Sequence, residues 1–114
     1  MNILSELNSS LEGIGLPIET GSFSDASPDE YLVITPLLDR LEHFADSLPN
    51  AQTEEVRLSL FTKGNYIALR NQLTNLLLKA GFSITGRRYI GFEEDTKYHH
   101  YAIDVMKEYE MEVI

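Results

Sequence analysis

Residues 53–82 read TEEVRLSLFTKGNYIALRNQLTNLLLKAGF, and their hydrophobic period changes half-way along. Val56, Leu58 and Leu60 alternate with polar residues, which is the period-two pattern of a half-buried β-strand. From residue 65 onward the apolar residues recur instead at helical spacing. They form a single stripe of Tyr66, Leu69, Leu73, Leu76, Leu77 and Ala80. We therefore expect a strand followed directly by an amphipathic helix over residues 65–80.

Both ends of this expected helix carry recognisable capping residues. Asn65 is a favoured N-cap, because its side-chain oxygen accepts hydrogen bonds from the first free backbone N–H groups. Gly81 suits the left-handed position that closes many helices, and Phe82 is then placed to fold back toward Leu77 in a Schellman-type closure.

The helix is followed by a pattern typical of a β-hairpin over residues 82–108. SITGRRYIGF and KYHHYAIDVMKEYE flank the acidic turn EEDT. Strict alternation places Arg88 on the same face as Phe82, Ile84 and Ile90. We expect this unusual arginine to reach an acidic residue of a neighbouring strand or subunit.

Residues 31–63 are expected to hold strands. Tyr31–Thr35 is β-branched and aromatic, which predicts a well-buried strand that ends at Pro36. The next segment, DRLEHFADSLP, fits a strand or a helix equally well. The adjoining segments are expected to be strands, and this favours the strand interpretation.

The N-terminal part predicts a short helix and a long connection. Residues 1–13 include an apolar helical pattern over residues 3–12, with Asn2 as N-cap and Gly13 as the stop. Residues 14–30 are rich in Gly, Pro, Ser and Asp, as in a long loop, within which Leu16–Ile18 could add a short edge strand.

The order of these elements indicates the fold class. Strands that arrive in pairs joined by short turns favour an antiparallel sheet. The sequence thus predicts an α+β fold, a mainly antiparallel sheet of about 4–5 strands with two helices packed on one face. The 114 residues fit a single domain.

Composition excludes several classes of function. The chain lacks cysteine and therefore thiolate nucleophiles, disulfides and cysteine-based metal sites. No apolar run suits a membrane span, and the N-terminus lacks the features of a signal peptide, so we expect cytoplasmic synthesis and no membrane contact. The net charge is −9, and residues 1–50 hold nine acidic residues against one basic. Such a surface repels phosphate backbones, which argues against sequence-independent nucleic-acid binding.

The adjacent histidines of the hairpin are candidates for a metal or catalytic site. His99 and His100 point to opposite faces of a strand, so they do not converge on one ion, and we expect no metal and no cofactor. Solvated acids at a turn tip make poor general acids or bases. We expect instead that the imidazoles contact Tyr89 or acidic residues across the strands.

Three segments together resemble a known protein family. They are PIETGSFSDASPDEYLVITPLLD (17–39), EVRLSLFTKGNY (55–66) and FSITGRRYIGFEEDTKYHHYAIDV (82–105). In these segments the chain resembles the tail-completion or tail-terminator proteins of long-tailed phages and of prophages in Gram-positive bacteria. The resemblance extends from about residue 15 to residue 110.

The resemblance implies a structural role in the virion. Terminator proteins are non-enzymatic α+β domains that form a hexameric ring on the tail tube, stop its growth and face the head connector. They are assembled in the host cytoplasm, and DNA passes through the ring without specific binding. For contacts with a neighbouring subunit or the tube we select the loop 19–30, the hairpin tip 91–97 and Arg88. The candidate residues are Glu19, Asp25, Asp29, Glu30, Arg88, Glu93, Glu94 and Asp95.

Other functions stay open at this point. The chain could be a head–tail connector or another minor tail component of similar size. It could be an acidic adaptor that binds one protein partner. A small enzyme that uses His99 or His100 would need a pocket with two such groups in hydrogen-bond reach.

Overall fold

A computed structural model describes residues 2–21, 28–42 and 48–111. The molecule is elongated, 54 × 27 × 22 Å. Its elements are α1 (Ile3–Ser10), the 3₁₀ turn η1 (Glu12–Ile14), β1 (Ile18–Thr20), β2 (Glu30–Glu42), β3 (Ala51–Thr62), α2 (Tyr66–Lys79), β4 (Ser83–Phe92) and β5 (His99–Glu110).

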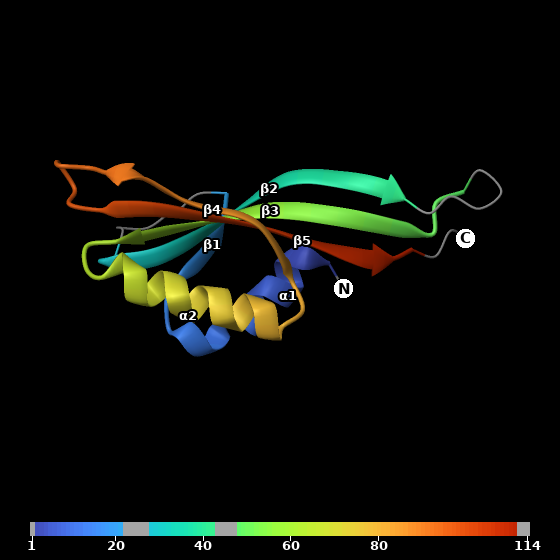
Figure 1. The fold of residues 1–114 in the computed structure, drawn as a ribbon, viewed down its shortest axis with the longest axis horizontal. Helices are drawn as coiled ribbons and strands as arrows, with labels where there is room; N and C mark the ends of the chain where they lie inside the picture. Colours follow the sequence, from blue (N-terminus) through green and yellow to red (C-terminus); the bar gives the residue numbers. More distant parts are fainter. Residues whose placement is uncertain (1, 22–27, 43–47, 112–114) are drawn as a thin grey trace.

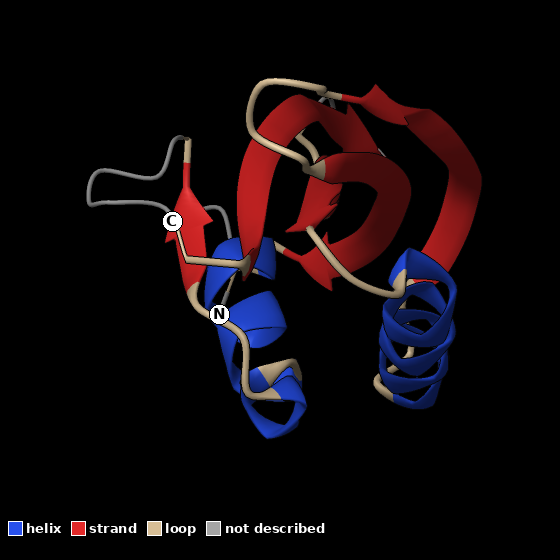
Figure 2. Ribbon diagram, turned by 90° about the vertical axis from the view of Figure 1, so that its left-hand side faces the viewer, coloured by secondary structure: helices blue, strands red, loops and turns tan. Residues whose placement is uncertain are grey.

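The five strands form one sheet in the order β1-β2-β3-β5-β4. Neighbouring strands are antiparallel except for β1, which runs parallel to β2. Both helices lie on the same side of the sheet (Figure 1), and an end view shows that the sheet is strongly curled above them (Figure 2). The predicted α+β class is thus confirmed, with a mixed sheet in place of a purely antiparallel one.

The hydrophobic core lies between the sheet and the two helices. Alternate residues of the three central strands point toward the helices and are almost completely buried: Leu32, Ile34, Val56, Leu58, Leu60, Tyr101, Ile103 and Val105. The helices contribute Ile3, Leu7, Leu11, Leu73 and Leu77. The apolar face of β3 and the apolar stripe of α2 therefore pack against each other in this core. This packing explains why residues 53–82 form a strand followed by a helix.

The capping of α2 is as the sequence predicts. Asn65 Oδ1 accepts hydrogen bonds from the backbone N–H groups of Ile67 (3.1 Å) and Ala68 (3.2 Å). Gly81 is left-handed (φ 89°). The N–H groups of Gly81 and Phe82 donate to the carbonyls of Leu78 and Leu77, both at 3.1 Å, which completes the Schellman closure.

The first helix ends earlier than predicted. Asn2 caps it by accepting from Ser5 N at 2.9 Å, as expected. The helix stops at Ser10, however, and the chain continues into η1, so the left-handed glycine is Gly15 (φ 76°) and not Gly13. Because of the 3₁₀ turn, the glycine that ends this helical segment lies two residues later than predicted.

The second strand continues past Pro36, where the sequence predicted its end. β2 runs to Glu42, and its register against β3 shifts between Pro36 and Leu38. Pro36 lacks a backbone N–H, but it lies at this bulge, and no described strand pairs with β2 there on the side away from β3. The strand can therefore continue through the proline. The strand interpretation is therefore confirmed for residues 39–42, whereas residues 43–47 lie outside the described part. The short strand β1 likewise lies at 18–20 and not at 16–18.

Two irregularities in β4 change which side chains share a face. The register against β5 shifts between Ile84 and Gly86 and again between Tyr89 and Gly91. Ile84 pairs with Val105, whose side chain lies in the core, whereas Arg88 pairs with Ala102 and lies on the face away from the helices. The prediction that Ile84 and Arg88 share one face is wrong because a bulge inserts a residue between them.

Candidate assembly interfaces

The hairpin between β4 and β5 ends in an exposed acidic turn. The backbone closes it through Glu93 N to Tyr98 O at 2.9 Å and Lys97 N to Glu93 O at 2.7 Å. Lys97 adopts a positive φ of 67°. Glu93, Glu94 and Asp95 are all exposed here, so three of the selected residues lie where a partner can reach them.

Tyr98 ties this turn to the start of β2. Its side chain is buried, its hydroxyl donates to the carbonyl of Pro28, and its ring lies edge-on to Tyr31 with centroids 5.5 Å apart. Lys63 Nζ lies 5.0 Å from the Tyr98 ring centroid. The structure therefore brings residues 28–30, 62–66 and 93–99 to one end of the molecule, which we call the hairpin end.

Two further selected residues lie at the hairpin end, and they differ in their partners. Asp29 is exposed and pairs with Lys63 at 3.5 Å. Glu30 accepts a hydrogen bond from the buried Thr62 hydroxyl at 2.7 Å. Because this bond joins β2 to β3, Glu30 has a structural role within the subunit. Asp29 and the hairpin tip are better placed for outside contacts.

The remaining selected residues are not part of this group. Glu19 lies on β1 and Arg88 on β4, which are the two opposite edges of the sheet. Asp25 lies outside the described residues. The prediction had grouped the loop and the hairpin without placing Glu19 and Arg88 on separate edges, because strand order does not follow from hydrophobic period.

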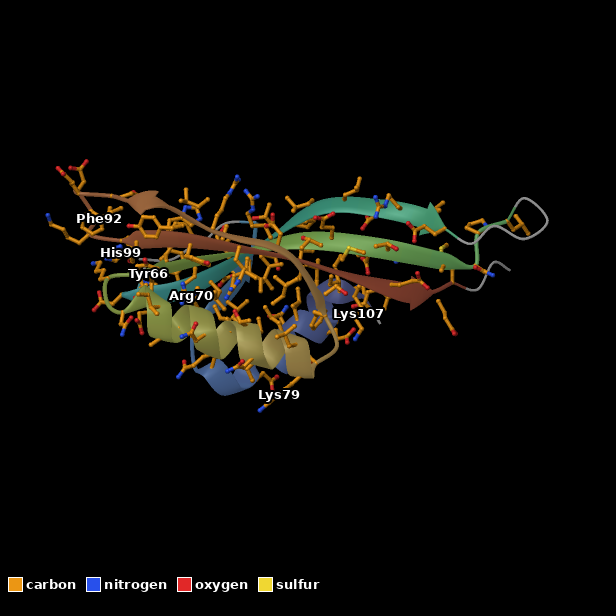
Figure 3. All side chains as sticks on the ribbon, in the orientation of Figure 1. Tyr66, Arg70, Lys79, Phe92, His99 and Lys107 are labelled. Atoms are coloured by element: carbon orange, nitrogen blue, oxygen red, sulfur yellow. The ribbon has the colours of Figure 1, made fainter. Side chains whose placement is uncertain are left out.

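The adjacent histidines have separate environments. His99 Nδ1 lies 2.9 Å from the Tyr89 hydroxyl, among the rings of Tyr66 and Phe92 at centroid distances of 5.4 and 4.8 Å (Figure 3). The expected cross-strand contact with Tyr89 is thus confirmed. His100 lies on the other face.

His100 is packed rather than paired. Its ring stacks on Phe61 with centroids 4.3 Å apart, and its buried Nε2 has no hydrogen-bond partner within the described residues. Burial lowers the pKa of His100, opposed by the nearby Glu93 charge, and Arg57 lowers it further. The ring therefore acts mainly as an aromatic packing group at neutral pH.

Two hollows on the described surface lie away from His99 and His100. One of about 580 Å³ is lined by Asn50, Ala51, Glu108, Glu110 and Met111, at the end of the sheet far from the hairpin tip. Another of about 340 Å³ lies between η1 and α2, lined by Gly13, Ile14, Gln72, Asn75 and Leu76.

Within the described ranges, no group of three or more His, Asp or Glu side chains is arranged to hold a metal ion. Nor does any described helix have the length and apolarity needed to cross a bilayer.

Two groups of exposed hydrophobic residues add to the selected interface residues, and of these only Phe92 falls within a predicted contact segment, the hairpin tip 91–97. Tyr89, Ile90 and Phe92 lie on β4 and are 42% to 45% exposed. Leu37, Leu38 and Leu41 lie on the distal part of β2 and are 43% to 52% exposed. The sequence pattern assigns these leucines neither to a core nor to a surface. The signal available was Pro36, after which the unbroken apolar run of residues 31–34 gives way to leucines mixed with charged residues.

Comparisons with known proteins give a likeness of fold. No family model and no curated protein matches the chain. Among solved structures, a chain of the virion of a native gene transfer agent particle is similar, with a TM-score of 0.53 at 9% identity. The alignment covers 95% of this chain and 91% of that chain. The likeness is therefore one of fold and extends over most of both chains.

Proposed function

We propose that this chain is a non-enzymatic structural protein of a phage or prophage virion, which caps the tail tube and joins it to the head connector as a ring. The observation that carries the proposal is the full-length likeness of fold to a chain of a virion particle. It adds to the independent resemblance of residues 17–39, 55–66 and 82–105 to tail-terminator proteins.

The surface supports a role in assembly. Exposed apolar side chains are concentrated on β4 and distal β2, where a partner can cover them. The acidic hairpin tip and Asp29 form a second, polar surface at the hairpin end. A subunit between a tube and a connector needs several such surfaces, because it contacts neighbours in the ring as well as proteins above and below.

The charge of the chain fits a conduit for DNA. Residues 1–50 hold nine acidic residues and one basic residue. In a ring, this acidic part supplies a wall that repels passing phosphates, so that DNA moves through without being held. The packing of His99 and His100 among aromatic rings supports a non-enzymatic role, since each imidazole serves a different face of β5.

The proposal is tested with the purified full-length chain and preformed tail tubes. Light scattering over a concentration series and negative-stain images measure whether the chain forms rings. Electron microscopy of tubes then measures whether added protein occupies one tube end and stops further growth. The variant Glu94→Lys/Asp95→Lys changes the hairpin tip without touching the core, and it is expected to weaken tube binding while leaving ring formation intact.

The outcomes are distinct. Ring-shaped particles that sit on tube ends support the proposal. A chain that leaves tube length and tube ends unchanged at every concentration overturns it. A stable one-to-one complex with a single protein and no ring would favour an adaptor instead.

A further inference from the structure

The sheet has two edges that the described strands leave open. No described strand lies beyond β4. On the other side, β1 pairs with β2 only from Leu32 to Ile34, so β2 from Thr35 to Glu42 has no described strand partner on the side away from β3. Open edges present unpaired backbone N–H and C=O groups and pair readily with another chain.

Opposite charges are concentrated at these two edges. The β4 edge holds Arg87 and Arg88 and no acidic residue. The β1–β2 edge holds Glu19, Glu30, Asp39 and Glu42, with Arg40 alone as a base. The two edges of the sheet therefore carry opposite net charges, and the strand order separates them.

Both edges also expose large apolar side chains. Tyr89, Ile90 and Phe92 are on β4, and Leu37, Leu38 and Leu41 are on distal β2. Covering either group removes apolar surface from water, which drives association. The two edges thus complement each other in charge and share the apolar character of an interface.

The direction of the strands permits their pairing. β2, β3, β5 and β4 are joined by three antiparallel steps, so β2 and β4 run in opposite directions. When a second copy is placed edge to edge in the same orientation, its β4 lies antiparallel to β2 of the first copy. Antiparallel pairs are the commoner arrangement. Because β1 already occupies Leu32–Ile34, the incoming strand fits alongside Thr35–Glu42.

We propose that copies of this chain associate head to tail, with β4 of one copy added antiparallel to the distal part of β2 of the next. This contact is heterologous, so it closes into a ring if the rotation between copies allows it. The inference rests on the proposed function and specifies its subunit contact. A two-fold contact between two β4 strands is disfavoured, because it would join two edges that each carry Arg87 and Arg88 and no acidic residue.

The absence of cysteine gives a direct test. Arg88→Cys and Asp39→Cys place one thiol on each edge at exposed positions. A short bis-maleimide cross-linker is then added to the full chain, and products are separated on a denaturing gel. The doubly substituted chain is expected to give a ladder of dimers, trimers and higher species. An equimolar mixture of the two singly substituted chains is expected to stop at dimers.

A control pair measures random collision. Lys97→Cys with Asp39→Cys moves one thiol from β4 to the exposed hairpin turn and is expected to give far less product. A ladder no stronger than this control overturns the inference. Efficient dimers from Arg88→Cys alone would show a two-fold β4 contact and would overturn it as well.

Charge reversal supplies a second, independent readout. Arg87→Glu is expected to weaken self-association about tenfold or more, since Arg87 and Asp39 both lie on the helix-facing side of the sheet, where like charges then meet across the contact. Lys97→Glu changes the net charge equally and is expected to have little effect. Asp39→Arg is also expected to weaken association, whereas an equimolar mixture of Arg87→Glu and Asp39→Arg chains is expected to restore it.

The two proposals fail in different ways. Rings on tube ends without a ladder leave the capping function intact and reject the edge contact. A ladder together with bare tube ends supports the edge contact and rejects capping.

Discussion

The two halves of the sheet use the same strands for different purposes. Under α2, β2, β3 and β5 turn fully buried side chains such as Ile34, Leu58 and Ile103 toward the helices. Beyond Pro36 the three strands continue as an arm, formed by residues 36–42, 51–55 and 106–110 (Figure 1). There, Leu38 and Leu41 are exposed. Stability is thus concentrated in the helix-covered half, and the arm is left available for contacts.

The helix α1 connects these halves through polar contacts. Lys107 Nζ binds Glu6 and donates to the carbonyl of Ala80 at the end of α2, at 3.2 Å. The Tyr109 hydroxyl donates to Glu6 at 2.7 Å, and Ile3 N donates to Glu54 at 3.1 Å. Hydrogen bonds fix geometry without requiring the broad apolar contact of the core. These contacts hold the arm segments 51–55 and 106–110 in a defined position relative to α1.

The largest expected effect separates the two halves by burial. Leu58→Ala removes a fully buried side chain from the central strand and is expected to lower the free energy of unfolding by about 2–5 kcal/mol. Leu38→Ala makes the same change in the arm, where the side chain is 47% exposed, and is expected to cost about 0.5 kcal/mol or less. Urea unfolding measures both. Equal losses would contradict the division.

The next effect concerns the end of α2. Gly81→Ala places a side chain on a residue with φ 89°, and the resulting backbone strain is expected to lower the free energy of unfolding by about 1–2 kcal/mol. No steric clash adds to this cost, because the nearest atom to an added Cβ is Lys107 Nζ at 3.6 Å. Gly86→Ala is the control, since its φ is not left-handed and an added Cβ has open space. If both variants unfold at the same urea concentration, the Schellman closure contributes nothing.

The link from α1 to the arm predicts a pH dependence. Burial tends to raise the pKa of Glu6, but the hydrogen bonds from Lys107 and Tyr109 and the Lys107 charge outweigh it, so the pKa lies below its ordinary value of 4.5. A lowered folded pKa contributes stability that is complete above the unfolded value and lost as pH falls through the folded value.

Glu6→Gln tests this link. It is expected to cost about 1–2 kcal/mol at pH 7, where hydrogen bonds to a charged carboxylate are lost. The difference from the unsubstituted chain should begin to shrink as the pH falls below the ordinary value of about 4.5, and it should vanish only below the still lower folded pKa, where the native carboxyl is neutral too. Glu12→Gln changes an exposed acid of η1 and serves as the control. A cost that does not change with pH would show that charge is not involved.

The sequence predicts the helix-covered half of the sheet better than the arm. Residues 53–82 predict β3, α2 and both α2 caps, because period and capping are local properties. Prediction fails in the arm and at the edge strand β4. Pro36 predicts the end of a strand, yet a bulge lets β2 continue, and the bulges in β4 move Arg88 to the other face. Bulges depend on pairing with a distant strand, so no local pattern reveals them.

The candidate interface shows the same limit. Exposed acids at the hairpin tip follow from the turn sequence, and the structure places them there. That Glu19 and Arg88 lie on opposite edges depends on strand order. The separation of basic and acidic segments is visible in the sequence, but its meaning appears only when the order β1-β2-β3-β5-β4 puts them on two edges.

The smallest effect compares two ion pairs. Arg57 and Asp104 pair between β3 and β5 through two hydrogen bonds of 2.8 and 3.1 Å, on the sheet face away from the helices. Lys63 and Asp29 at the hairpin end are joined at 3.5 Å with both side chains more exposed. Paired contacts of an arginine with a carboxylate are stronger and better oriented than a single lysine contact.

Double-mutant cycles are expected to give a coupling free energy of about 1 kcal/mol for Arg57–Asp104 and close to zero for Lys63–Asp29. Each cycle uses Arg57→Ala with Asp104→Ala, or Lys63→Ala with Asp29→Ala, and urea unfolding at low and high salt. Coupling of the first pair should persist at high salt, since its side chains are about a quarter to a third exposed. Equal couplings would mean that the hairpin end is held as firmly as the sheet. Weak coupling of Lys63–Asp29 leaves Asp29 available to a partner at little cost to the fold.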